Sequence, residues 1–155
     1  MIIAFCGHAD YIKHEPHEQI LLDILQTEIG NNPVELFFGG YGSFDTFALQ
    51  CGIKYRRMHP NTKLILVTPY LSKASFCYMK NNKTTYDTVL YPPLENIPPK
   101  YAIVHRNRWI VEQADLIIAY VNHPWGGAFT TLQHAKKKEK RIFNLASVST
   151  FQQET

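Results

Sequence analysis

Five short apolar runs recur along the chain, and stretches with helical periodicity separate most of them. The first run, residues 2–6, is continuously apolar rather than alternating, which is typical of a strand buried on both faces of a sheet. The predicted strands are 2–6, 34–38, 64–67, 116–121 and 142–145, and the predicted helices are about 15–28, 44–57, 101–113 and 127–139. For residues 72–100 we assign no structure beyond a candidate short strand at 89–91.

Strands that alternate with helices of this length predict parallel pairing through right-handed crossovers. We therefore expect an α/β fold, a single Rossmann-like three-layer domain with about five parallel strands in the order 3-2-1-4-5 and helices on both faces. The domain is expected to span residues 1–146, followed by a polar tail at 147–155. In such a sheet a ligand binds outside the carboxyl ends of the strands, where the strand order reverses. The loops after the first, second and fourth predicted strands are therefore the places to look for function.

Composition narrows the classes of protein that fit. The chain has 155 residues, enough for one domain, and 16 Lys and Arg against 13 Asp and Glu give a net charge of only +3, which argues against nucleic acid as a partner. Its three cysteines are widely spaced and fit neither a disulfide framework nor a paired zinc site, so a reduced cytoplasm is the expected location. The apolar stretches are far shorter than the roughly 20 residues that a membrane span needs, so no membrane partner is expected.

Two of the three loops contain a glycine pair that leads into a helix. The first reads Gly39, Gly40, Tyr41, Gly42, Ser43, and the second is Gly126 and Gly127. Glycines let the backbone approach an anion closely, and a helix N-terminus supplies unpaired N–H groups and about half a positive charge. One such pair could merely permit a tight turn, but two pairs at equivalent strand ends favour a phosphate site.

Neither glycine segment matches a standard nucleotide motif. Asp45 stands where the dinucleotide fingerprint requires its third glycine, and neither segment is followed by a Walker lysine and hydroxyl pair. We therefore expect no dinucleotide cofactor and no cofactor of another kind. Asp45 either interacts favourably with the helix dipole from the first turn or accepts hydrogen bonds from ribose hydroxyl groups.

Arg106 and Asn107 precede the apolar face of the helix that feeds the fourth predicted strand. A guanidinium at this place could bind a phosphate in a bidentate manner, although a solvated surface arginine fits the pattern equally well. Arg108 and Glu112 stand four residues apart, which favours an exposed ion pair.

Histidines and lysines offer weaker signals. His8 lies beside Gly7 at the end of the first predicted strand, and a packed or capping histidine is favoured there over a catalytic one. The closest histidine pair, His14 and His17, has no third ligand nearby, so we expect no metal site. The cationic run at residues 136–141 follows the end of a helix, where a solvated end is favoured over a nucleic-acid patch.

Four segments together resemble the SLOG superfamily, a Rossmann-like group that includes DprA-type and LOG proteins, and are most similar to its short YpsA-like branch. The similarity covers roughly residues 3–145. The segments are Cys6, Gly7 and His8; residues 39–45; Arg106 and Asn107 with Ala114 and Asp115; and Gly126 and Gly127 with Thr130. The resemblance implies that these loops bind a nucleotide or a nucleotide-derived molecule. The implied binding residues are Gly7, His8, Gly39, Gly40, Gly42, Ser43, Asp45, Arg106, Asn107, Gly126, Gly127 and Thr130.

The chain departs from these relatives at several positions. Ala9 stands where the YpsA-like branch usually has an arginine after the strand-one histidine. The LOG motif has a second glycine and a glutamate where this chain has Phe129 and Gln133. Binding is therefore expected to carry over better than hydrolysis.

Three functions remain open from the sequence. The leading one is a sensor that binds a nucleotide or nucleotide derivative. The second is an N-glycoside hydrolase of nucleoside 5'-monophosphates, with Asp45 or Glu112 as its catalytic carboxylate. The third is a DprA-like nucleic-acid accessory protein that uses the cationic run at 136–141, and a homodimer is left open for all three.

Overall fold

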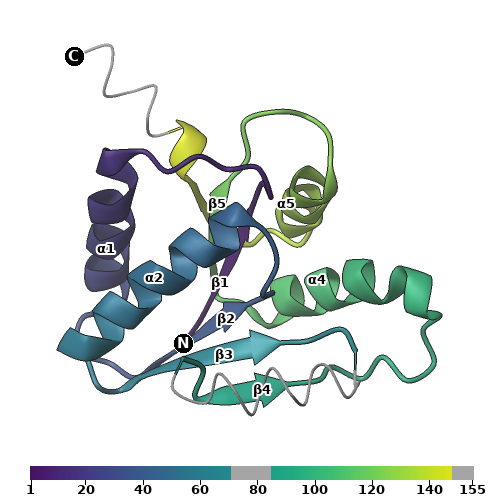
Figure 1. The fold of residues 1–155 in the computed structure, drawn as a ribbon, viewed down its shortest axis with the longest axis horizontal. Helices are drawn as coiled ribbons and strands as arrows, with labels where there is room; N and C mark the ends of the chain where they lie inside the picture. Colours follow the sequence, from purple (N-terminus) through teal and green to yellow (C-terminus); the bar gives the residue numbers. More distant parts are fainter. Residues whose placement is uncertain (71–84, 148–155) are drawn as a thin grey trace.

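The computed structural model describes residues 1–70 and 85–147. Within them, six parallel strands form one sheet in the order β4-β3-β2-β1-β5-β6 (Figure 1). The strands are β1 Ile2–Gly7, β2 Val34–Phe38, β3 Thr62–Val67, β4 Thr88–Leu90, β5 Leu116–Tyr120 and β6 Arg141–Asn144. The helices are α1 Glu15–Ile29, α2 Ser43–Met58, α4 Ala102–Gln113 and α5 Gly127–Lys137, with a short 3-10 turn at Pro99–Tyr101.

The predicted α/β fold, with a parallel sheet flanked by helices, is confirmed, but the predicted number of five strands is wrong. The sixth strand is β4, which pairs with β3 at the edge of the sheet, with Thr88 opposite Ile65. It corresponds to the candidate strand at 89–91. β4 has only three residues, and none of them is fully buried, so it lacks the continuous apolar run that marks central strands such as β1 and β5.

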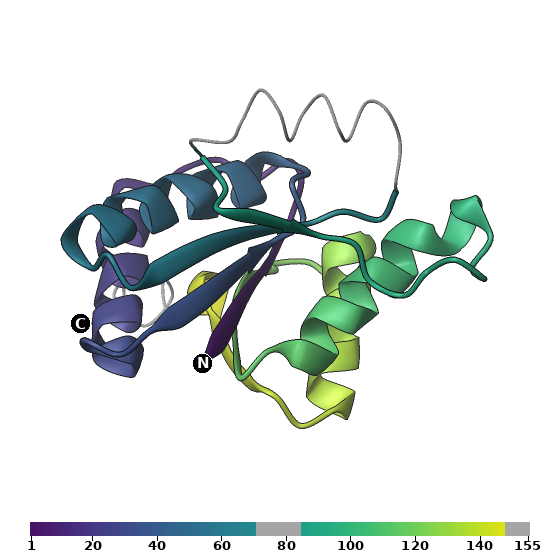
Figure 2. The ribbon, with the colours of Figure 1, turned by 90° about the horizontal axis from the view of Figure 1, so that it is seen from below.

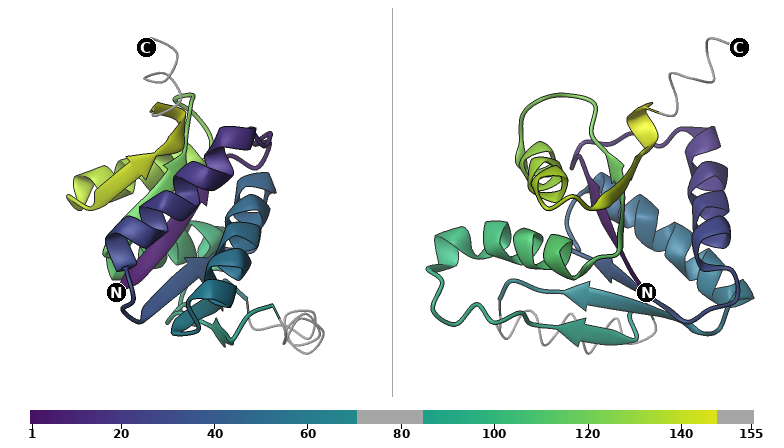
Figure 3. Two further views of the ribbon diagram at one scale, coloured as in Figure 1. Left: turned by 90° about the vertical axis from the view of Figure 1, so that its left-hand side faces the viewer. Right: turned by 180° about the vertical axis from the view of Figure 1, so that it is seen from behind.

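The helices cover the two faces of the sheet in pairs. α1 and α2 lie on one face and α4 and α5 on the other, as the views in Figures 2 and 3 show. Along β1, Ile3 and Phe5 pack in the core on the α1–α2 side, and Ala4 packs in the core on the α4 side. This two-sided burial explains why the strand is continuously apolar in sequence.

A close approach of α2 to β1 brings the loops at the carboxyl edge together. Gly7 ends β1, and a Cβ atom at this position would lie 2.2 Å from the ring of Phe44 in the first turn of α2. Only glycine leaves room for that ring. The loop after β1 therefore lies directly against the start of α2.

Some expectations about the chain's extent are not addressed by the described residues. Residues 71–84 of the unassigned stretch and residues 148–155 of the predicted tail lie outside them. The predicted domain boundary at residue 146 accordingly stays a prediction. No described helix combines the length and the apolar character that crossing a membrane requires.

Candidate functional site

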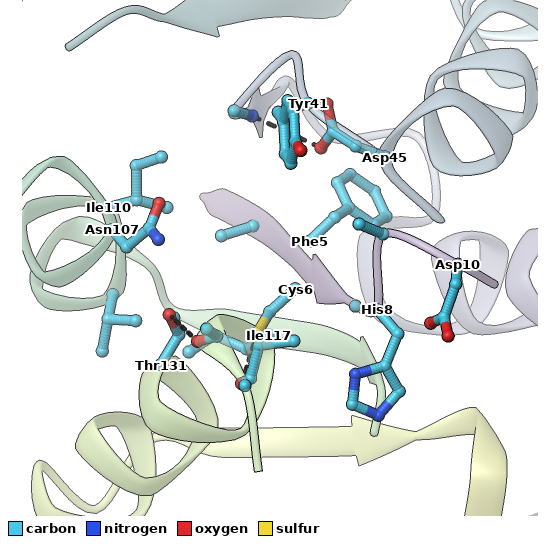
Figure 4. Close-up of a pocket in the computed structure, with 18 of the residues that line it drawn as sticks. Phe5, Cys6, His8, Asp10, Tyr41, Asp45, Asn107, Ile110, Ile117 and Thr131 are labelled. Carbon is cyan, nitrogen blue, oxygen red and sulfur yellow. Dashed lines mark hydrogen bonds between the residues drawn. The ribbon is translucent and has the colours of Figure 1, made fainter. Parts of the chain in front are cut away.

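A cavity of about 390 Å³ lies at the carboxyl ends of β1, β2 and β5 (Figure 4). The strand order reverses between β1 and β5, because β2, β3 and β4 extend to one side of β1 and β5 and β6 to the other. This is the position at which parallel sheets of this type bind their ligands. The loops after the three strands form the cavity together with α4.

The cavity brings together many of the residues that the sequence singled out, but not all of them. Its lining includes Gly7, His8, Gly39, Asp45, Asn107, Gly126 and Gly127. The predicted binding residues that do not line it are Gly40, Gly42, Ser43, Arg106 and Thr130. Their binding roles stay predictions, and the contacts that the structure gives them are mostly to the protein's own backbone. Ser43, for example, donates its hydroxyl to the carbonyl oxygen of Tyr11 at 2.5 Å.

The glycine turn after β2 already holds an anion of its own. The carboxylate of Asp45 accepts hydrogen bonds from the N–H groups of Gly39 at 3.3 Å and Gly40 at 2.5 Å. Burial raises the pKa of Asp45 to about 6, while the N–H groups of Gly40 and Gly39 and the charge of Arg106 act to lower it. Two of the N–H groups that were expected to hold a phosphate are therefore bonded to a carboxylate, and the N–H of Ser43 donates to the carbonyl oxygen of Ala9.

The buried side chain of Arg106 forms a hydrogen bond to the glycine turn after β2. Its side chain is only 4% exposed, and one guanidinium nitrogen donates to the carbonyl oxygens of Gly39 and Val67, both at 2.9 Å. Its Nε donates to Oδ1 of Asn107 at 2.8 Å. The phosphate contact expected of Arg106 stays a prediction, and in the structure its donors are directed to the protein.

The glycine turn after β5 is open by comparison. Gly126 has a φ of 91° and caps α5, and among the described residues no side chain caps the first N–H groups of that helix, as is also true of α2. The difference is that no carboxylate turns back onto Gly126 and Gly127 as Asp45 does onto Gly39 and Gly40 within the described residues. A Cβ atom added to Gly126 or Gly127 would meet nothing within 4 Å. The positive end of α5 therefore faces open space beside the cavity.

Three stacked rings stand next to this open turn. Trp125 stacks on His123 with ring centres 4.0 Å apart, and His123 stacks on His8 at 3.6 Å. His8 is 6% exposed, whereas Trp125 is 64% exposed. The stack thus runs from the protein interior to an exposed indole that also lines the cavity.

Sequence reasoning missed several of these lining residues. Tyr41, 81% exposed, and Asp10, His123 and Trp125 all line the cavity but were not among the candidates. A usable signal was present, because Tyr41 and Trp125 are aromatic residues directly beside a glycine pair at a strand end. An exposed aromatic at that place indicates a stacking surface.

His8 itself is a packed histidine in the structure. Its Nε2 accepts a hydrogen bond from the backbone N–H of Asn122 at 3.1 Å, which places the ring proton on Nδ1. Burial and the neighbouring His123 lower its pKa, while Asp10 acts to raise it. A neutral, fixed imidazole of this kind holds His123 in place.

His8, Asp10 and His123 could hold a metal ion by proximity alone, since one ligand atom of each lies within 4.8 Å of the others. The geometry does not favour it. The two imidazoles are stacked only 11° from parallel, so their lone pairs do not converge, and Nε2 of His8 is already an acceptor. The sequence expectation of no metal stays a prediction.

The candidate catalytic carboxylates are separated in space. Glu112 does not line the cavity, and its Oε1 lies 3.4 Å from Nε2 of His134. Gln133, at the position of the LOG glutamate, lines a different groove. Of the two candidates only Asp45 reaches the cavity, and both of its oxygens are bonded to backbone N–H groups.

Comparison with known proteins finds likeness in fold and not in sequence. No protein-family model matches the chain, and no curated protein is significantly similar to it. DNA processing protein A from Helicobacter pylori superposes with a TM-score of 0.63 at 17% identity, covering 93% of this chain and 64% of that one. DNA processing protein A from Streptococcus pneumoniae superposes with a TM-score of 0.60 at 17% identity, covering 92% and 49%.

The fold is shared with DNA processing protein A. The chain spans 64% and 49% of the lengths of these two proteins. The Rossmann-like fold expected from the sequence, which DprA-type proteins share, is thereby confirmed. The finer placement in the YpsA-like branch and the LOG-like activity stay predictions.

The expectation that nucleic acid is not a partner is contradicted by the same comparison. The Helicobacter pylori protein of this fold is described by its binding mode for single-stranded DNA. The expectation rested on a net charge of +3, which averages over the whole surface. A net charge carries no information about a local site.

Proposed function

We propose that this protein binds single-stranded nucleic acid and holds one nucleotide of the strand in the carboxyl-edge cavity. One observation carries the proposal: the stack of Trp125, His123 and His8 stands beside the uncapped start of α5 within a single cavity. A base and its phosphate need these two features next to each other. The shared fold with a protein described as binding single-stranded DNA supports the same conclusion.

The base is held by stacking on Trp125. Stacking of a base on an aromatic side chain contributes about 1–3 kcal/mol and tolerates any base. His123 backs the indole at 4.0 Å and is itself fixed by buried His8, so little freedom is lost on binding. Tyr41 presents a second exposed ring from the loop after β2.

The phosphate is placed at the α5 side of the cavity. Gly126 and Gly127 expose the first N–H groups of a helix, which attract an anion. The opposite side carries the carboxylates of Asp45 and Asp10, which repel one. The exposed carboxylate of Asp10 is suited to accept hydrogen bonds from a sugar hydroxyl or a base N–H group, whereas both oxygens of Asp45 are bonded to backbone N–H groups.

A fluorescence titration tests the proposal. The chain has two tryptophans, and Trp109 packs beside Phe37, so a Trp109→Phe variant leaves Trp125 as the reporter. We expect saturable quenching by a thymidylate oligonucleotide. In fluorescence anisotropy with a labelled oligonucleotide, Trp125→Ala should weaken binding by roughly tenfold or more.

Tyr101→Ala is the matched control, because Tyr101 is an exposed aromatic that does not line the cavity. It should leave the affinity unchanged. Absence of binding to oligonucleotides, or equal affinity in the wild type and Trp125→Ala, contradicts the proposal. Thymidine monophosphate that binds as tightly as the oligonucleotide would instead indicate a binder of free nucleotides.

A further inference from the structure

A groove of about 210 Å³ between α4 and α5 continues from the cavity. Thr131 lines both spaces, and on α4 the cavity residue Asn107 is followed directly by the groove residue Arg108. α4 and α5 pack on the same face of the sheet (Figure 2). A strand that leaves the open end of the cavity at α5 therefore meets this groove.

Two exposed cations from different helices line the groove, Arg108 from α4 and Lys137 from α5. Neither forms an ion pair within residues 1–70 and 85–147. Lys140, beyond the end of α5, is by contrast engaged with the protein, because its Nζ donates to the carbonyl oxygens of Glu112 and Ala114.

Glu112, an acidic residue four positions after Arg108 in α4, also has a partner within the protein. Arg108 was expected to pair with Glu112, but the carboxylate of Glu112 instead lies 3.4 Å from Nε2 of His134, a groove residue. Arg108 is thus left with its full charge toward solvent. Exposed positive charges such as those of Arg108 and Lys137 attract an anionic polymer.

We propose that the α4–α5 groove carries the backbone of the strand as it leaves the cavity, with Arg108 and Lys137 neutralising phosphates on its two walls. This inference rests on the function proposed above. Lys137 lies about 15 Å along the axis of α5 from Gly127, a distance that extends beyond one nucleotide. The groove therefore binds only ligands longer than the unit held in the cavity.

The other side of α5 offers a competing path. A wider depression there is lined by His123, Asn144 and Lys136, with Lys136 as its only lysine or arginine. The α4–α5 groove is favoured because it presents a cation on each wall. Lys136 and Lys137 are neighbours in one helix with the same charge, so they form a matched pair for deciding between the two paths.

The experiment compares Arg108→Ala, Lys137→Ala and the control Lys136→Ala with thymidine monophosphate and a thymidylate decanucleotide at several salt concentrations. For the decanucleotide, Arg108→Ala and Lys137→Ala should each weaken binding by roughly threefold or more and each reduce the slope of log K against log salt by about 0.7. Thymidine monophosphate, which fills only the cavity, should bind all three variants as it binds the wild type. Lys136→Ala should match the wild type with both ligands.

The two proposals fail in different ways. Wild-type protein that binds no oligonucleotide contradicts the proposed function and the groove together. Tight binding that depends on Trp125 but is unaffected by Arg108→Ala and Lys137→Ala overturns the groove alone. A Lys136→Ala variant that loses as much decanucleotide affinity as Lys137→Ala shows that the strand takes the other side of α5.

Discussion

The glycine turns that enter α2 and α5 have nearly the same backbone but different occupants. Gly42 caps α2 with a φ of 92°, and Gly126 caps α5 with a φ of 91°. Four residues later each helix carries a threonine whose hydroxyl donates to the capping glycine's carbonyl oxygen at 3.1 Å. The first three helical residues differ between the two helices, and the difference that changes the hydrogen bonding is at the third, which is Asp45 in α2 and Phe129 in α5.

That one position decides what each turn can do. Asp45 reaches back to the N–H groups of Gly39 and Gly40 and closes the first turn. Phe129 has no acceptor atom and packs beside the small core cluster at Val121 and Leu132. The second turn therefore keeps its N–H groups for a ligand, and a glycine-rich loop alone does not define an anion site.

The largest expected effect is a loss of stability in Arg106→Ala, because Arg106 supports the closed turn after β2. Arg106→Ala removes the donor shared by the buried carbonyls of Gly39 and Val67, which should lower the free energy of unfolding by about 3 kcal/mol. For a domain of this size, the melting temperature should fall by roughly 10 °C. Thermal unfolding followed by circular dichroism measures the change.

Arg108→Ala is the control, because Arg108 is an exposed neighbour on the same helix. Its free energy of unfolding should stay within about 0.5 kcal/mol of the wild type. Equal melting temperatures for the two variants would mean that Arg106 does not support the turn. The predicted contact between Arg106 and a phosphate would then be favoured again.

A pair of valine substitutions tests whether the two turns differ in function. At Gly42 a Cβ atom would lie 2.9 Å from Cα of Ala9 at a φ of 92°, so Gly42→Val should lower stability by about 1–3 kcal/mol. At Gly127 a Cβ atom meets nothing within 4 Å, so Gly127→Val should fold normally. It should nevertheless weaken oligonucleotide binding by roughly tenfold to a hundredfold, because the side chain covers the N–H groups that face the phosphate.

Thermal unfolding and anisotropy on the same samples separate these effects. Gly127→Val that unfolds early would show that the second turn is structural, like the first. Gly127→Val with normal affinity would move the phosphate away from α5.

The sequence predicted the strands that are buried on both faces because their apolar runs are continuous, as at Leu116 to Tyr120. It also predicted a site at the strand ends, where the structure has its cavity, because sheets of this topology bind ligands there; that the cavity is a binding site stays a prediction. It could not tell the closed turn from the open one. That difference depends on two sets of contacts. Arg106 donates to the carbonyl oxygens of Gly39 and Val67, which are distant in sequence, and the carboxylate of Asp45 accepts from the N–H groups of Gly39 and Gly40.

The smallest expected effect is a pH dependence confined to the closed turn. Burial raises the pKa of Asp45 from its ordinary value of 3.8 to about 6, so between these pH values the folded protein binds a proton that the unfolded chain has released. Asp45 should therefore contribute less stability as the pH rises from about 5 to about 7, by about 1 kcal/mol, and Asp45→Asn should lack this change. Denaturant unfolding of both proteins across this range measures the change. If the wild type instead gains stability relative to Asp45→Asn as the pH rises, the N–H groups and Arg106 outweigh burial. The closed turn would then hold a fully charged carboxylate in the way that the open turn is expected to hold a phosphate.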